Sequence, residues 1–234
     1  MFWQNVLIGA IAGGIAALIL PQISKILKLS ESVSIKVSQI GVATCAILAV
    51  NFIPAHIFNS GLDSSPANAS KEVDKILANT EQMTAEATQQ KLINDSNDKL
   101  ATITDVAKKK NSAASSFIGY YLVNMRSRVE YCSKQGVDIT EFSNEFDKVN
   151  QRELVSARNI LKLTHEAEDN FYQQSKDGFT KAIETQMQKQ ANEAKISMKD
   201  FCEAIKANSE VMADSLQYSK LVPIQSQILI SAAH

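Results

Sequence analysis

The residues of this chain with the clearest chemical potential are its cysteines. Cys132 lies in the last turn of a predicted helix over about 113–134, and Cys202 lies in the first turns of a later one. Neighbouring helices could bring these two ends together, and an oxidising compartment would then favour a disulfide. The competing interpretation is two unconnected thiols, which becomes preferable in a reducing compartment. Cys45 sits in an apolar run and is interpreted as a small apolar residue.

The other candidates for chemistry are carboxylates. Residues 165–169 (HEAED) could bind a metal weakly, although such a run more often forms a solvated helix face. Glu141, Glu145 and Glu153 could line one helix, but acid–base work also needs a cleft. The chain lacks the short motifs of serine hydrolases, zinc proteases, P-loop proteins and C-x-x-C redox sites. We therefore expect no catalytic residue, no cofactor and no metal.

Charge is spread unevenly along the chain. The 24 basic and 25 acidic side chains of the 234 residues leave no broad basic field, so nucleic acid is not the expected partner. The first 58 residues hold only four charges: Lys25, Lys28, Glu31 and Lys36. Residues 59–234 therefore carry 21 basic and 24 acidic groups, a net charge of −3.

Two stretches without Asp, Glu, Lys or Arg occupy residues 1–24 and 37–62. A hydrocarbon core needs about 20 apolar residues in a helix, and both stretches reach that length. The sequence predicts a transmembrane hairpin over residues 1–58, with spans at about 3–23 and 38–58. A buried core helix or a cleaved signal peptide are the alternatives. A signal peptide would need a basic n-region, which this N-terminus lacks.

Basic residues beside the spans predict their orientation. The loop 25–36 holds three lysines, whereas the N-terminal flank holds no basic side chain. The positive-inside rule then keeps this loop in the cytoplasm and both chain ends outside. The preferred setting is a bacterial inner membrane with the remainder of the chain in the periplasm. The lipid bilayer is thus one expected partner.

Small residues recur every four positions in the first span, at Gly9, Gly13 and Ala17. Such a stripe lets another helix backbone approach closely. The stripe could pack on the second span, on another membrane protein or on a second copy. It could also reflect nothing more than the high Gly and Ala content of membrane helices.

The remainder of the chain is typical of an all-α domain. Residues 59–70 are small and polar and predict a linker, and residues 71–220 have few glycines and no proline. A first helix over about 70–112 has a thin apolar stripe, which indicates a long exposed or coiled-coil-like helix. The next helix, over about 113–134, is apolar on most sides and should be central.

Capping patterns divide the second half of the domain. Asp138 and Glu141 predict the start of a helix that could run past Phe171, and Ser197 with Asp200 predict the start of the last one. The tail 221–234 is apolar for its length. We favour a tail that folds back on the bundle over one that docks on a partner or on the membrane.

The sequence therefore predicts a two-helix transmembrane hairpin followed by an extramembrane helical bundle. The leading hypothesis is a non-catalytic interaction module, an accessory or scaffold subunit of an envelope complex that binds partners through its membrane helices and its helical domain. A homo-oligomeric pore or mechanical assembly is a second class. An unrecognised enzyme or ligand sensor with a pocket in the bundle is a third.

Overall fold

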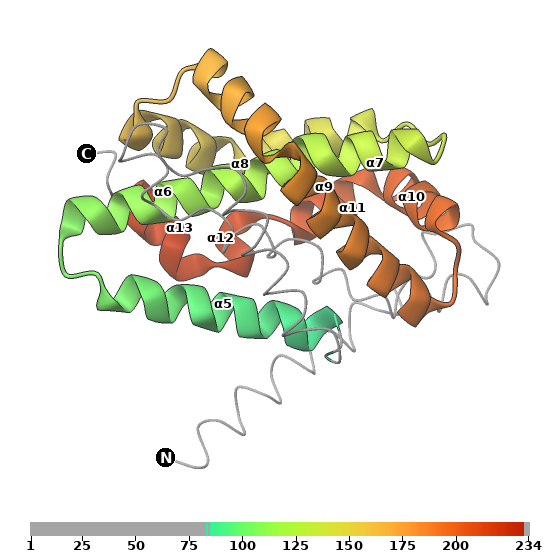
Figure 1. Ribbon diagram of the computed structural model, residues 1–234, viewed down its shortest axis with the longest axis horizontal. Coiled ribbons are helices and arrows are strands. Elements are labelled where there is room, and N and C mark those ends of the chain that lie inside the picture. Colours follow the sequence, from blue (N-terminus) through green and yellow to red (C-terminus); the bar gives the residue numbers. More distant parts are fainter. Residues whose placement is uncertain (1–82, 84, 232–234) are drawn as a thin grey trace, which may run out of the picture. The chain divides into compact units, whose positions relative to one another are not determined.

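The polar C-terminal part of the chain folds into a bundle of α-helices (Figure 1). The computed structural model describes residues 83 and 85–231, and no strand occurs among them. In chain order the elements are α5 (Ala85–Thr102), α6 (Val106–Leu122), the π-helical turn η2 (Val123–Ser127), α7 (Arg128–Lys134), α8 (Thr140–Leu161), α9 (His165–Ala194), α10 (Met198–Ala207), α11 (Ser209–Ser215), α12 (Tyr218–Leu221) and α13 (Pro223–Ile230). The predicted all-α class is confirmed for this part.

The predicted hairpin over 1–58, with Gly9, Gly13 and Ala17, and the linker 59–70 lie outside the described residues. In the part of the chain that the structure describes, no helix combines the length and apolar character needed to cross a bilayer. The hairpin and its orientation therefore stay predictions.

One continuous helical rod, α6–η2–α7, forms the centre of the bundle. Residues 113–122 of α6 are buried on every side, which agrees with the predicted central helix. Helices α8 and α13 pack on α6, and α9 packs on η2 and α7. Within η2 the buried Asn124 side chain donates to the carbonyl oxygen of Tyr120 at 2.9 Å. A π-turn adds one residue per turn and so shifts the faces of the rod between its two halves.

The long first helix expected over 70–112 is wrong at its C-terminal end. Helix α5 ends at Thr102, and α6 begins at Val106. Asp105 caps α6 by accepting a hydrogen bond from the Lys108 backbone N–H at 3.0 Å. The Thr102 hydroxyl donates to the Lys99 carbonyl oxygen at 2.7 Å, a side-chain-to-backbone bond that competes with the helical hydrogen bonds. A coiled-coil register therefore does not continue from α5 into α6.

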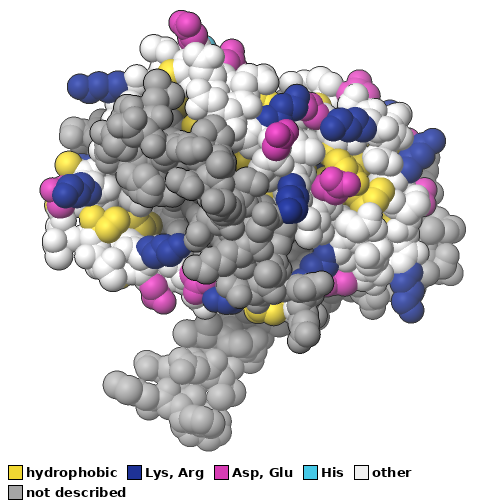
Figure 2. Space-filling model, viewed as in Figure 1, with side chains coloured by type: hydrophobic (Ala, Val, Ile, Leu, Met, Phe, Trp, Pro, Cys, Tyr) yellow, Lys and Arg dark blue, Asp and Glu magenta, His cyan; other side chains and the backbone are white. Residues whose placement is uncertain are grey.

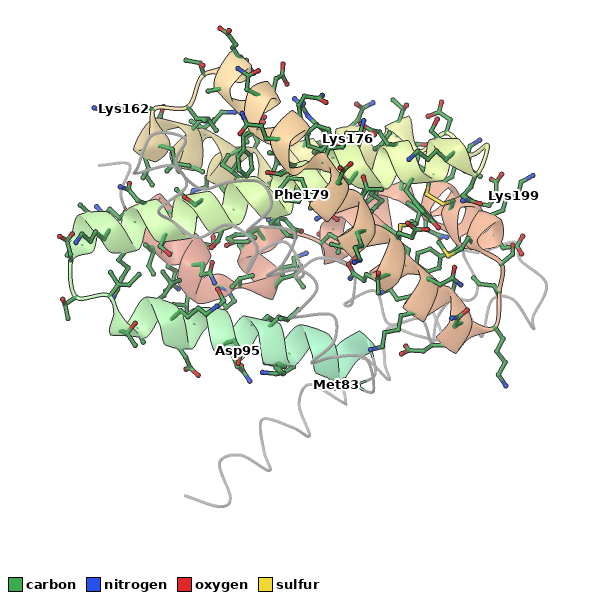
Figure 3. All side chains as sticks on the ribbon, in the orientation of Figure 1. Met83, Asp95, Lys162, Lys176, Phe179 and Lys199 are labelled. Carbon is green, nitrogen blue, oxygen red and sulfur yellow. A yellow bond between two sulfur atoms is a disulfide. The ribbon has the colours of Figure 1, made fainter. Side chains whose placement is uncertain are left out.

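The helix that starts after Asp138 also ends earlier than expected. Helix α8 stops at Leu161 because Lys162 adopts a left-handed conformation with φ 51°. Lys162 projects outward at the turn between α8 and α9 (Figure 3). The predicted capping pair at the start of α10 is confirmed, since the Ser197 hydroxyl accepts from the Asp200 N–H at 3.1 Å. At the start of α8, Asp138 accepts from the Thr140 N–H at 2.9 Å.

The C-terminal segment returns to the middle of the bundle. In Figure 1, α12 and α13 lie between α5 and α6, and α13 contacts both α6 and α8. Pro223 opens α13, where its missing N–H costs no helical bond. Val222 and Leu229 are fully buried. The C-terminal segment therefore packs back on the bundle, with Val222, Gln225, Ser226 and Leu229 buried in it.

Candidate functional site

The centre of the bundle is an aromatic cluster around Tyr218. The Phe117 ring meets the Tyr218 ring edge-on at 5.0 Å, and the Tyr120 ring lies 5.1 Å from it. Tyr120 also lies 5.5 Å from Phe146 of α8 and donates its hydroxyl to the Leu216 carbonyl. Helices α6, α8 and α12 are thus joined by rings in the geometry that aromatic pairs prefer.

A chain of buried polar groups leads away from the same tyrosine. The Tyr218 backbone N–H donates to Asn150 Oδ1 at 2.8 Å, and its hydroxyl donates to Gln225 Oε1 at 2.7 Å. Gln225 Nε2 then donates to the Ser96 hydroxyl at 2.7 Å. Four buried side chains from α8, α12, α13 and α5 are thereby linked in one network.

A carboxylate lies beside this network. Glu153 of α8 is only 3% exposed, and its Oε1 accepts from the Ser226 hydroxyl at 2.7 Å. Burial, together with the negative charge of Glu153, raises the pKa of Tyr218 well above its ordinary value. The Tyr218 hydroxyl therefore stays protonated and keeps its role as the donor to Gln225.

A second cluster joins α8 and α9 through Glu168. Its carboxylate is 2% exposed and accepts two hydrogen bonds from Arg158, at 2.8 and 2.9 Å. The hydrogen bond to Glu168 raises the pKa of Arg158. The Tyr121 hydroxyl donates to Asp147 at 2.6 Å, and burial raises the Tyr121 pKa above its ordinary value. The solvated face predicted for 165–169 is thus wrong at Glu168.

A third cluster surrounds Tyr172 on α9. Arg126 of η2 stacks over its ring with Cζ 5.0 Å from the centroid, and the Lys176 ammonium lies 5.9 Å away (Figure 3). The Tyr172 hydroxyl donates to Glu130 at 3.0 Å, and Lys176 pairs with the same carboxylate at 2.8 Å. Burial raises the pKa of Tyr172 to about 12. Asp169 completes the cluster by pairing with Arg126.

The carboxylates that the sequence singled out do not converge. Glu141 is exposed, Glu145 pairs with Lys148 at 3.1 Å, and Glu153 points into the core. Over residues 85–231, no group of three or more His, Cys, Asp and Glu side chains is arranged to hold a metal ion. These side chains therefore act as separate structural contacts in the described part of the bundle.

The predicted cysteine pair is present. Cys132 and Cys202 form a disulfide with Cα atoms 5.5 Å apart, which ties α7 to α10. Both side chains are fully buried. By chain entropy, closing a loop of 70 residues contributes about 4 kcal/mol of stability. Cys45 lies outside the described residues.

Sequence reasoning missed the polar network. Ser96, Asn150 and Gln225 resemble ordinary solvated residues in the sequence, and each is buried. No signal in the sequence separates buried Gln225 from exposed Gln227 two residues later in the same tail. The partners of Gln225 come from 129 residues earlier in the chain and from the next helix back, so spacing alone does not identify them.

Comparison with protein-family models, with curated proteins and with solved structures finds no match to this chain. The bundle is therefore interpreted from its own geometry.

Replacing a member of the polar network tests whether it holds the C-terminal helices. Gln225→Leu leaves the Tyr218 and Ser96 hydroxyls without their partner, and we expect a loss of roughly 1–3 kcal/mol in unfolding free energy. The measurement is urea unfolding of the chain in mild detergent, followed by near-UV circular dichroism. Gln227→Leu, on the exposed side of α13, is the control. Equal losses in the two variants would contradict the structural role.

Reduction of the disulfide has a simple readout. The oxidised chain should migrate faster than the reduced chain on a denaturing gel, because the bond closes a 70-residue loop. Cys132→Ser and Cys202→Ser should each abolish the difference, whereas Cys45→Ser should preserve it. Mobility that does not change with reductant, together with free labelling of both thiols, would count against the bond.

Alkaline pH should weaken the fold through Tyr172. Its pKa is 10.0 when exposed and about 12 in the folded chain, so the unfolded state loses this proton first. The stabilisation is complete below pH 10.0 and disappears as pH rises toward 12. Tyr172→Phe should make the fall in urea midpoint over this window shallower and leave the dependence at lower pH unchanged. An unaltered slope would show that the phenol does not titrate as argued.

Proposed function

We propose that this chain is a membrane-anchored, non-catalytic interaction module, an accessory or scaffold subunit of a bacterial envelope complex. Its helical domain would lie in the periplasm, and the predicted hairpin over residues 1–58 would hold it at the inner membrane. The observation that carries the proposal is the buried disulfide between Cys132 and Cys202.

The disulfide supports an oxidising compartment. Disulfides persist in the periplasm and outside cells, and are rare in the reducing cytosol. The charge distribution also favours a helical domain outside the cytoplasm, because the three lysines of the loop 25–36 would keep that loop in the cytoplasm. These two observations are independent, since one rests on folded geometry and the other on residues near the spans.

The use of the buried polar groups supports a binding role over a catalytic one. Gln225, Asn150 and Tyr218 bond to one another or to neighbouring helices, and Glu168 is held by two bonds from Arg158. A catalytic acid, base or nucleophile must instead face a substrate. The side chains left for recognition are those on the helix surfaces, such as the polar outer face of α9.

Purification of the full chain from membranes in mild detergent tests the proposal. We expect a stoichiometric foreign chain in the purified complex, identified by mass spectrometry and by the mass of the intact particle. A large assembly of this chain alone would overturn the accessory role in favour of a self-assembled pore or scaffold. A lone monomer would also count against it.

A pair of variants distinguishes packing through the first span from other contacts. Gly9→Leu with Gly13→Leu adds bulk to the small-residue stripe and should release the partner if that stripe forms the contact. Gly14→Leu adds the same bulk about 100° further round the helix and serves as the control. A complex that survives the double variant would show that the Gly9 and Gly13 stripe does not form the contact.

A further inference from the structure

The turn between α5 and α6 lies at one edge of the bundle (Figure 1). Apolar side chains at and beside this turn are exposed. Val106, the first residue of α6, is 66% exposed, more than any other large apolar side chain in the described part. Ala107 is exposed beside it, and Ile103 is half-buried. A single exposed valine needs no explanation, but its neighbours here are charged.

Four lysines flank these apolar residues in the sequence. Lys99 lies in the last turn of α5, and Lys108, Lys109 and Lys110 lie in the first turns of α6. None of the four forms an ion pair within residues 85–231. Figure 2 shows hydrophobic, basic and acidic side chains next to one another at this edge. We call this set, Lys99, Ile103, Val106 and Lys108–Lys110, the basic corner.

The stability of α6 does not account for these lysines. Cations near the start of a helix interact unfavourably with the backbone dipoles. The capping carboxylate of Asp105 is the one acidic group at this end of α6, because the first turn itself has none. Helix α9 follows the usual preference, with Glu166 and Glu168 in its first turn. Lys108 is exposed, Lys109 and Lys110 are half-buried, and helix stability alone does not explain three consecutive lysines at this position.

We infer that the basic corner docks on the anionic lipid surface of the membrane. Apolar side chains flanked by lysines fit a lipid interface, where the apolar groups enter the headgroup region and the ammonium groups meet phosphates. Residues 98–110 carry four basic and two acidic groups, whereas the rest of 85–234 carries 15 basic and 18 acidic groups. An anionic surface thus attracts this edge and repels the remainder, which sets the orientation of the domain.

This inference deepens the proposed function and rests on its membrane attachment. The anchor keeps the domain close to the bilayer, so a modest attraction is enough to orient it. Each lysine near an anionic surface changes the docked population about fivefold, and removing three changes it about a hundredfold.

Fluorescence of the full chain in vesicles tests the docking. Trp3→Phe with Val106→Trp leaves one tryptophan at the basic corner, and Trp3→Phe with Val211→Trp puts it at another exposed valine. Both variants are reconstituted in phosphatidylglycerol–phosphatidylcholine vesicles with brominated acyl chains, and in phosphatidylcholine alone. We expect strong quenching at position 106 in anionic vesicles only, and none at position 211.

Charge removal and salt complete the test. Lys108→Gln, Lys109→Gln and Lys110→Gln together should reduce quenching at position 106 to its level in neutral vesicles, and high salt should do the same. Equal quenching at positions 106 and 211, or quenching that ignores lipid charge, overturns the inference. Unquenched tryptophan at position 106 also overturns it, and an acidic protein surface would then be the better candidate to bind the basic corner.

A further experiment distinguishes failure of the membrane-anchoring proposal from failure of lipid docking by the basic corner. Alkaline carbonate extracts a chain that has no membrane span, which would refute the anchoring proposal. The extracted full chain can then be mixed with the same vesicles. Flotation with anionic vesicles, lost in the triple lysine variant, would support the basic corner on its own, and no flotation would overturn it.

Discussion

Burial of the Tyr218 side chain is the constraint on which the other helices depend. Its ring packs on Phe117 of the central rod, its backbone N–H reaches Asn150 of α8, and its hydroxyl reaches Gln225 of α13. A tyrosine can be buried in this way only when its hydroxyl has a partner. The C-terminal helices must therefore return to the core, and Gln225 in turn fixes where α5 packs through Ser96.

Charged side chains also join the helices to one another. Arg158 and Glu168 join α8 to α9, and Glu130 meets Tyr172 and Lys176 where α7 faces α9. Breaking the Arg158–Glu168 pair costs more than forming it gains, because the Glu168 charge would stay desolvated. The Glu130–Lys176 pair is more than a third exposed and stabilises the fold less. These contacts consequently specify which helix faces meet.

Local sequence signals predicted the elements, but only one of the contacts between them. The Ser197 cap, the apolar helix around Phe117 and the cysteine pair were all predictable, because each depends on residue type at short range or on a rare residue. The break before Val106 was missed because the capping bond from Asp105 competes with a helix-favouring sequence on both sides. Gln225 was missed because its partner Ser96 is 129 residues away.

At the starts of the helices, some residues stabilise the helix and others do not. Asp105 and Ser197 each satisfy a backbone N–H at the start of a helix, as local energetics require. Lys108 donates only its backbone N–H to that cap, and its ammonium finds no carboxylate in the described part. Sequences that break a local rule without an internal gain commonly do so where a surface meets a partner. The lysines after α5 break the rule in this way. Because the rest of 85–234 carries a net negative charge, an anionic surface would attract this edge and repel the remainder.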